Sequence, residues 1–428
     1  MSETFCPLPW THLIVRGDGG AQTCNWSSDR IRDDGVDMNV GRSSLESIWN
    51  SRHMRDIRRA MVAGRRVSAC QACYATEELG GQSMRQQMLQ RWQNGFLNEE
   101  RATVETLKAE AARHDFNVAR RPRFLQLDVG NLCNLRCRMC SSGASSAINR
   151  DPVHRRWSEV ALDLVHKEDA WFRLPIVRRG LIEDATELRQ LHVIGGEPLA
   201  IREVGELLRL VVESGRARDV EVSFHTNATI TRPSWLELLS EFGAVVVYVS
   251  VDGTERLYDY IRFPARWHSF VRNLDILRDR LRAELRGHVV VQIYNALDVV
   301  SIFRFLDARQ VPIHPHLLWE PAFLRPTLLP RSARVLAARR LRTYAREECR
   351  PNAKELVLGV ATMLERAEDE NPELLHEFMV FTNDLDHVRG QRFAEVDAEL
   401  MEHLGTAGVT WTSEIRHASN RPAPARSR

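Results

Sequence analysis

The residues of this chain best suited to chemistry are three closely spaced cysteines, Cys133, Cys137 and Cys140. They form a C-x3-C-x2-C run directly after a strand-like stretch, residues 124–129. Three such thiolates lack the fourth ligand of a tetrahedral zinc, but they can bind three corners of a [4Fe–4S] cube and leave its fourth iron open for chemistry. Three structural cysteines, or a zinc knuckle completed by a remote His or Cys, are the alternatives.

A second motif supports the cluster interpretation. Gly195, Gly196, Glu197 and Pro198 follow an apolar stretch, residues 191–194. A strand-exit turn would explain the glycines and the proline, but not the cysteines upstream. Together the motifs resemble CxxxCxxC and GGEP of the radical S-adenosylmethionine (SAM) superfamily. The resemblance implies that the open iron binds the amino and carboxylate groups of SAM, and that Gly195, Gly196 and Glu197 hold its amino group.

Polar residues also follow the next two predicted strands, 220–224 and 245–249. Asn227 ends the first in a TNG-type motif, with Ala228 in place of the usual glycine. The second ends in an SxDG motif that contains Ser250 and Asp252, with Asp259 and Arg262 downstream. Such residues are also ordinary turn formers. The resemblance implies that these motifs bind SAM and that Ser250 and Arg262 contact its carboxylate. The SAM-binding residues that it implies here are Asn227, Ser250, Asp252 and Arg262.

Predicted strands at 288–294 and 311–318 complete six, and polar residues at successive strand ends are typical of a (β/α) barrel. We therefore expect an α/β protein: a partial (β/α)6 TIM-type barrel, a small N-terminal α+β iron–sulfur domain and a helical C-terminal region. The expected boundaries are 1–120, 121–330, 331–416, and a disordered tail at 417–428. One departure from the family is Met139, which replaces the aromatic residue that relatives place before the third cysteine.

Four more cysteines lie in the N-terminal region: Cys6, Cys24, Cys70 and Cys73. A hairpin is expected between the first two, with a strand at 11–15, and an amphipathic helix is expected to run to Met61. This order resembles the SPASM/twitch auxiliary-cluster domain, here ahead of the barrel as in a subgroup of twitch-type proteins. Four thiolates suit zinc or [4Fe–4S], and the resemblance favours a second, auxiliary iron–sulfur cluster. Whether a substrate or Cys349 fills one corner stays open.

Composition narrows the class of protein. Apolar residues make up 43% and charged residues 27%, as in globular proteins. Because 59 basic residues nearly balance 57 acidic ones, a nucleic-acid surface over the whole chain is not expected. No stretch is long and apolar enough for a membrane span, and the first residues have no signal-peptide pattern. Eight cysteines in such a chain favour metal ligation over disulfides, which predicts a cytoplasmic, oxygen-sensitive protein.

Other polar residues have more than one interpretation. Asp128 and Asp252 at strand ends are candidate proton acceptors or turn residues. His314 and His316 face the same side of a strand and bind a metal or substrate, or form a polar strand face. The charged segment 384–392 is expected to be a solvated face, with closing the barrel mouth or contacting substrate as alternatives.

The function implied by the resemblance is reductive cleavage of SAM to methionine and a 5′-deoxyadenosyl radical. That radical abstracts hydrogen from a peptide or peptide-like substrate, as in the subgroup. A small-molecule substrate, such as a sugar or amino-acid derivative, is the close alternative. An iron–sulfur electron carrier and a zinc-binding interaction protein are less favoured. The reaction implies an external one-electron donor of the flavodoxin or ferredoxin type.

Overall fold

The computed structural model describes residues 4–78, 82–94, 104–119, 121–158, 171–174, 177, 180, 187–367 and 371–418. The chain divides into two compact units. Unit 1 comprises Met1–Gly130, His166–Phe224 and Pro233–Val245, and unit 2 comprises Asn131–Val165, His225–Arg232 and Val246–Arg428. Most residues from 159 to 186, between the first two predicted strands, and the expected tail from residue 419 onward lie outside the described residues.

The predicted α/β class is confirmed by a sheet with strand order β10-β9-β8-β7-β6-β5-β1-β2. Pairs β5–β6, β6–β7, β8–β9 and β9–β10 are parallel. The six predicted core strands are β5 Phe124–Asp128, β6 Gln190–Ile194, β7 Glu221–Thr226, β8 Ala244–Ser250, β9 Glu284–Val291 and β10 Ile313–Leu317. The fifth ends three residues earlier than predicted, because Asn295 Oδ1 accepts a hydrogen bond from Gln292 N (2.8 Å) and turns the chain.

Helices connect these strands, as the alternating pattern requires. They are α9 Arg202–Glu213, α10 Pro233–Ser240, α11 Glu255–Ile261, α12 Trp267–Leu281 and α13 Val299–Ala308. In unit 1, Leu125, Leu191 and Val222 are fully buried at matched positions of β5, β6 and β7. Alternation along the strands leaves the opposite face of the same strands polar, and this face is the one available to a site.

The predicted N-terminal hairpin is present and extends the core sheet. Strand β1 (His12–Val15) pairs antiparallel with β2 (Ala21–Gln22) and parallel with β5. The helix expected to end at Met61 belongs to a pair, α2 (Leu45–Trp49) and α3 (Arg52–Val62), because the Ser51 side chain caps α3. The other N-terminal elements are α1 Leu8–Thr11, β3 Arg32–Asp33, β4 Val36–Asp37, η1 Ser68–Cys70, α4 Gln71–Glu78, α5 Met84–Gln93 and α6 Val104–Arg113.

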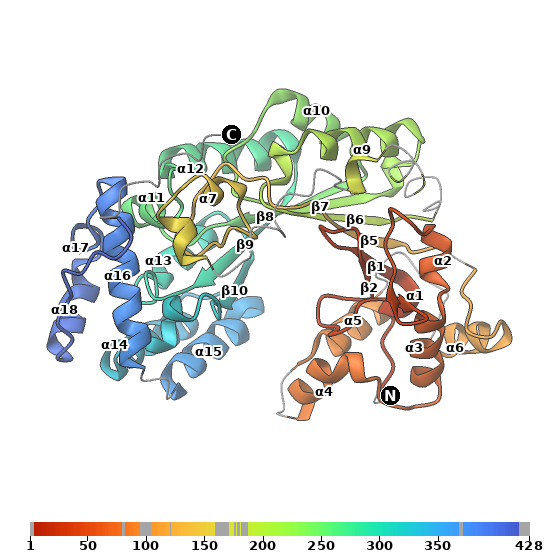
Figure 1. Cartoon of the computed structure of the whole chain (residues 1–428), viewed down its shortest axis with the longest axis horizontal. Coiled ribbons are helices and arrows are strands. Elements are labelled where there is room, and N and C mark those ends of the chain that lie inside the picture. Colours follow the sequence, from red (N-terminus) through yellow and green to blue (C-terminus); the bar gives the residue numbers. More distant parts are fainter. Residues whose placement is uncertain are drawn as a thin grey trace, which may run out of the picture. The chain divides into compact units, whose positions relative to one another are not determined.

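The C-terminal part of unit 2 is helical, as predicted. It contains α14 Arg331–Glu347, α15 Pro351–Arg366, α16 Pro372–Arg389, α17 Phe393–Val396 and α18 Ala398–Thr406. Helix α15 packs against α14 and beside β10 (Figure 1). Between Phe393 and Leu404 this helical region is broken at Asp397, whose carboxylate accepts a hydrogen bond from Leu400 N (2.9 Å) and starts α18.

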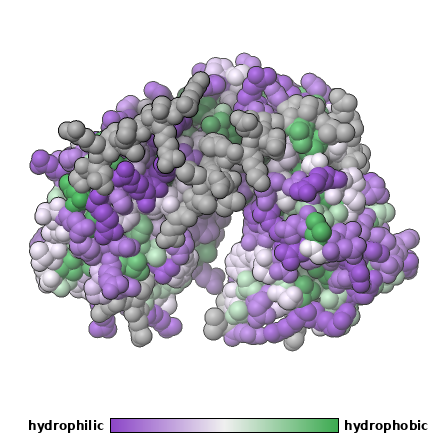
Figure 2. Space-filling view, viewed as in Figure 1, coloured by the Kyte–Doolittle hydropathy of each residue, from purple (hydrophilic) through white to green (hydrophobic). Residues whose placement is uncertain are grey.

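Short helical segments occupy several loops. They are α7 Ser146–Asn149, η3 His154–Trp157, η5 Trp171–Arg173, η6 Pro198–Ala200, η7 Ala217–Asp219, η8 Ala322–Leu324 and η9 Pro326–Leu328. On the face drawn in Figure 2, hydrophilic residues predominate among the coloured atoms. Within the described ranges, every helix is too short or too polar to cross a membrane.

Four histidines gather on one face of the strands in unit 2. The rings of His288 and His316 lie 4.6 Å apart, and those of His225 and His288 lie 5.1 Å apart. His225 also stacks on Tyr248 at 4.6 Å, and His314 lies opposite His288 in the strand register. His314 and His316 thus belong to a larger polar strand face. Among the described residues, no group of three or more His, Cys, Asp or Glu side chains is arranged to hold a metal ion.

The histidine face makes stability depend on pH. Burial, followed by the nearby His225 and His316, lowers the pKa of His288 to about 2; Arg262 and His314 act in the same direction. The unfolded chain protonates this residue below about pH 6.5, whereas the folded chain does not. Because the folded pKa is the depressed one, its contribution to stability is complete above pH 6.5 and is lost as the pH falls.

We therefore expect the free energy of unfolding to decrease between pH 6.5 and pH 5, and His288→Gln to remove up to about 1.4 kcal/mol per pH unit of that slope. Urea unfolding followed by circular dichroism at several pH values measures it. His268→Gln, on the exposed face of α12, is the control and should keep the wild-type slope. A wild-type slope in His288→Gln would contradict the explanation.

Candidate functional site

The three cysteines of the C-x3-C-x2-C run lie on the loop after β5, in unit 2. The side chains of Cys133 and Cys137 are buried, Cys140 is half-buried, and all three are free thiols. The thiols of Cys137 and Cys140 form a hydrogen bond with each other, which lowers the pKa of Cys137 and raises that of Cys140. Leu135 N also donates to Cys133 Sγ (3.4 Å).

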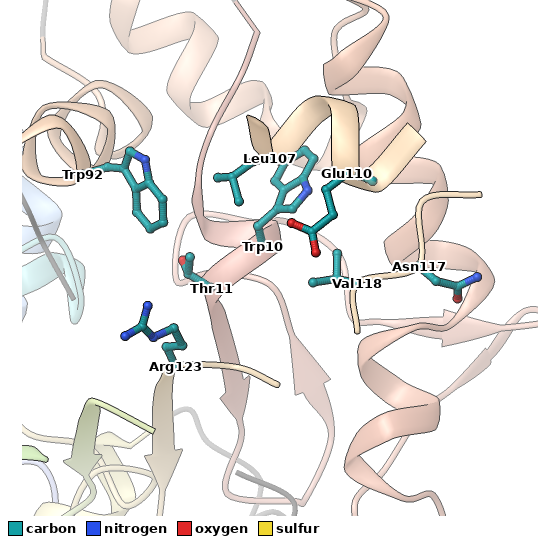
Figure 3. Close-up of a pocket in the computed structure, with 9 residues that line it drawn as sticks. Trp10, Thr11, Trp92, Leu107, Glu110, Asn117, Val118 and Arg123 are labelled. Atoms are coloured by element: carbon teal, nitrogen blue, oxygen red, sulfur yellow. The ribbon is translucent and has the colours of Figure 1, made fainter. Parts of the chain in front are cut away.

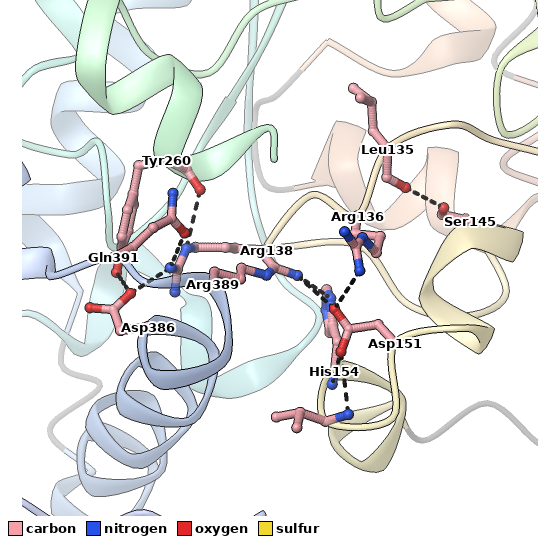
Figure 4. A network of polar contacts seen from close by, with 11 residues as sticks. Leu135, Arg136, Arg138, Ser145, Asp151, His154, Tyr260, Asp386, Arg389 and Gln391 are labelled. Carbon is pink, nitrogen blue, oxygen red and sulfur yellow. Dashed lines mark hydrogen bonds and ion pairs between the residues drawn. The ribbon is translucent and has the colours of Figure 1, made fainter. Parts of the chain in front are cut away.

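Backbone hydrogen bonds hold this loop against the segment that follows α11. Arg136 N donates to Phe263 O (2.7 Å), and Arg138 N donates to Ile261 O (2.9 Å). On its other side, Ser145 Oγ donates to Leu135 O (2.6 Å; Figure 4). Hydrogen bonds therefore fix the backbone of this loop at residues that lie between the three cysteines.

The residues present fit an iron–sulfur cluster by the chemistry of their donors. Three thiols on one loop, two buried and one half-buried, supply soft sulfur ligands, and Arg262 and Arg389 lower the pKa of Cys137 further. Each thiolate of a [4Fe–4S] cluster binds a different iron, so the ligands need not converge on one ion.

A buried ion pair lies close to the cysteine loop. Arg262 Nη2 and Asp252 Oδ2 are 2.6 Å apart, and the two side chains are 7% and 0% exposed. Asp252 Oδ1 accepts from Val290 N (2.8 Å), and burial raises the pKa of Asp252 against the opposing effect of Arg262. Within the described part of the chain, Arg262 Nε has no hydrogen-bond partner. Ser250 ends β8 opposite His288 in the strand register.

Asn227 contacts the cysteine loop directly. Its Nδ2 donates to Asn134 Oδ1 (3.0 Å) and lies 3.9 Å from Cys133 Sγ. The next residue, Ala228, has φ +55°, the left-handed conformation that glycine adopts most easily. The glycine usual at this position in the family thus has a conformational reason, and here Asn273 Nδ2 holds the alanine through Ala228 O (2.8 Å).

The GGEP segment lies in unit 1, at the end of β6. A Cβ on Gly195 would lie 2.8 Å from Gly130 O, so the close approach of two strand ends requires glycine there. Gly196 N donates to the same carbonyl (2.8 Å). Glu197 is fully buried and its Oε1 accepts from Leu199 N (3.1 Å). Asp128, at the end of β5, accepts from Gly130 N (3.3 Å) in a turn.

The structure brings the four N-terminal cysteines together within unit 1. Burial raises the pKa of Cys6, with Cys24, Cys70 and Cys73 adding to the effect, and it raises the pKa of Cys70 to about 12. Cys6 and Cys73 are buried and Cys24 and Cys70 are half-buried, and a bound cation would offset the cost of ionising the four thiols together. Cys349 lies in unit 2, beside Tyr344 and Asp307.

One part of the site was interpreted only partly correctly from the sequence. The charged segment 384–392 has an exposed face with His387 and Arg392, but Asp384 is fully buried and the side chain of Arg389 is 2% exposed. Its partners come from distant parts of unit 2, such as Arg138 and Trp157. The signal in the sequence is Arg138 itself, an arginine between two cluster-type cysteines. Such an arginine, once buried, needs a carboxylate partner from a distant part of the chain.

A separate cavity in unit 1 is too small for a substrate. Its volume of about 20 Å³ has room for roughly one water molecule. Figure 3 shows the residues that line it: Trp10, Thr11, Trp92, Leu107, Glu110, Asn117, Val118 and Arg123. Trp10 Nε1 has no hydrogen-bond partner in the described ranges, and a water here would supply one.

No curated protein matches this chain. Solved structures of low similarity include anSMEcpe with bound AdoMet and Cp18Cys peptide (18% identity, 53% of this chain, 60% of that chain, TM-score 0.37). They also include Streptococcus suis SuiB bound to S-adenosylmethionine (12% identity, 67% of this chain, 63% of that chain, TM-score 0.38). The chain thus spans about 60% of the length of these proteins, and likeness of this size carries no argument on function.

Family models match two parts of the chain. Residues 127–306 match the radical SAM superfamily, and residues 6–74 match an iron–sulfur cluster-binding domain, SPASM. The first kind of domain implies a [4Fe–4S] cluster and SAM and indicates an enzyme, and the second implies auxiliary iron–sulfur clusters. The chain therefore carries a radical SAM domain, preceded by an iron–sulfur domain of the SPASM type.

Proposed function

We propose that this protein is a radical SAM enzyme whose site cluster is held by Cys133, Cys137 and Cys140. The observation that carries the proposal is the loop of three cysteines without a disulfide, two buried and one half-buried, held by backbone hydrogen bonds within the residues matched by the superfamily. When bound, the [4Fe–4S] cluster and SAM supply one-electron cleavage of the sulfonium to methionine and a 5′-deoxyadenosyl radical.

The residues that we propose for SAM binding have distinct tasks. Asp252 orients Arg262, and Arg262 Nε is a charge-assisted donor for the carboxylate of SAM. In the family motif, Ser250 contacts the same carboxylate. Gly195, Gly196 and Glu197 hold the amino group of SAM, as in the family motif, and Gly195 leaves room for the close approach of Gly130 O. Asn227 steadies the loop through Asn134.

The second proposed cluster belongs to Cys6, Cys24, Cys70 and Cys73, which lie in unit 1 close enough for the other three to raise the pKa of Cys6. The SPASM match favours iron–sulfur over zinc. Such a cluster suits either electron transfer from a product radical or ligation of substrate.

For the substrate we propose a peptide or peptide-like molecule, in keeping with the SPASM/twitch subgroup, and a flavodoxin- or ferredoxin-like electron donor. A sugar or amino-acid derivative is the alternative. Incubation with peptides encoded beside this gene, followed by mass spectrometry, separates the two: a mass change confined to a small metabolite would contradict the peptide proposal.

Each of Cys133→Ala, Cys137→Ala and Cys140→Ala should abolish reductive cleavage of SAM, because loss of one thiolate removes the open iron. The measurement is 5′-deoxyadenosine by chromatography, after anaerobic reconstitution and reduction with dithionite. Cys349→Ala, which removes a half-buried cysteine of the same unit outside the loop, is the matched control and should keep wild-type product. Wild-type levels in any of the three loop variants would overturn the assignment.

A Cys70→Ala/Cys73→Ala double variant tests the auxiliary cluster. Its iron content should fall by about half, because one of two [4Fe–4S] clusters is lost. Cleavage of SAM in the absence of substrate should persist. Stoichiometric zinc in the wild type, with iron unchanged in the variant, would show that this site binds zinc.

A further inference from the structure

The loop between Cys137 and Cys140 is bonded to the C-terminal helix α16 and the turn after it. Arg138 is fully buried, and its Nη2 donates to Asp386 Oδ1 (2.5 Å) and Gln391 Oε1 (2.9 Å; Figure 4). Its Nε donates to Tyr260 O (3.2 Å), and its guanidinium lies 3.6 Å from the centre of the Tyr260 ring. Two donor atoms of Arg138, Nε and Nη2, therefore hold this loop in place, and Nη2 bonds it to α16 and the turn after it.

A second arginine, at the end of α16, approaches the same loop. The side chain of Arg389 is 2% exposed, and its Nη2 lies 3.4 Å from Asp151 Oδ2 and 3.1 Å from His154 Nδ1. Since arginine only donates, Nδ1 of His154 accepts. The same histidine also hydrogen-bonds the backbone of Cys140. Arg389 is thus linked to the cysteine loop through one side chain.

Arg389 has more unmet donor atoms than Arg138. Its Nε and Nη1 are buried and have no hydrogen-bond partner among the described residues, whereas for Arg138 this holds of Nη1 alone. A buried guanidinium with two unmet donor nitrogens costs free energy unless something accepts from them. The charge of Arg389 lowers the pKa of Cys137, in keeping with its link to the cysteine loop through His154.

The sulfur atoms of an iron–sulfur cluster are acceptors of the required kind. Hydrogen bonds to these sulfurs, and nearby charge, are among the factors that set the reduction potential of a cluster. A positive charge stabilises the reduced, more negative cluster over the oxidised one. Burial lowers the pKa of Arg389 only to about 10, so the charge persists at neutral pH.

We propose that Arg389 donates hydrogen bonds from its unmet Nε and Nη1 to sulfur atoms of the site cluster and thereby raises the reduction potential of that cluster. The inference rests on the proposed function, because it requires the cluster at Cys133, Cys137 and Cys140. It also makes α16 part of the site: Asp386 positions the loop through Arg138, and Arg389 tunes the cluster bound there.

The test is a redox titration of the reconstituted full-length protein, followed by electron paramagnetic resonance of the reduced cluster. The Cys70→Ala/Cys73→Ala background leaves one cluster to titrate. In Arg389→Gln the ratio of reduced to oxidised cluster at a fixed potential should fall about tenfold, which is ~59 mV for a one-electron couple. Arg389→Lys keeps the charge and a donor, and should stay within about threefold of the parent protein.

Arg392→Gln is the matched control, since this arginine lies three residues further on with its side chain 80% exposed. It should leave the ratio unchanged. An Arg389→Gln protein with full iron content and the parental ratio would overturn the proposal, as would loss of the cluster from both Arg389 variants, which would make the role purely structural. If only Arg389→Gln lost iron, the cluster potential of Arg389→Lys would decide. A ratio of reduced to oxidised cluster within about threefold of the parent would support the proposal, and a larger change would contradict it.

The two levels of the account fail differently. If the parent protein binds no reducible cluster at all, the proposed function fails. If it binds one whose potential is indifferent to Arg389, the proposed function stands and the inference about Arg389 is wrong.

Discussion

The site depends on one constraint, the pair of backbone hydrogen bonds that hold the cysteine loop to the segment after α11. Arg136 N and Arg138 N bond to Phe263 O and Ile261 O, on either side of Arg262. The same contact therefore fixes the spacing of the thiols and brings the buried Arg262–Asp252 pair close to them. A flexible loop with the same three cysteines would lose far more conformational entropy on binding a cluster.

The core of the fold could be predicted from the sequence because its signals are local. Apolar strands such as β6 and β8 end in glycine or in polar residues, and the structure places all six predicted strands with shifts of a few residues at their ends. The cysteine loop and the Ala228 position are local too. Ala228 adopts the φ of the glycine that it replaces, so the family pattern carried conformational information even where the residue differed.

Longer-range features were beyond such signals. The pairing of β1 with β5 joins strands more than one hundred residues apart, and no spacing in the chain indicates it. The contacts of Arg138 with Asp386 and of Arg389 with Asp151 likewise join segments far apart in the chain. In isolation, the charged segment 384–392 has the pattern of a solvated helix face. Burial changes that interpretation, because a charge removed from water must have a partner.

The central claim is that the loop of Cys133, Cys137 and Cys140 binds a cluster with one iron open to SAM. Mössbauer spectroscopy of the iron-labelled protein, with and without SAM, tests this claim most directly. The account predicts that SAM shifts the signal of a single iron site, the one without a cysteine ligand, and leaves the other irons unchanged. A spectrum that SAM does not alter, from a protein with full iron content, would contradict it.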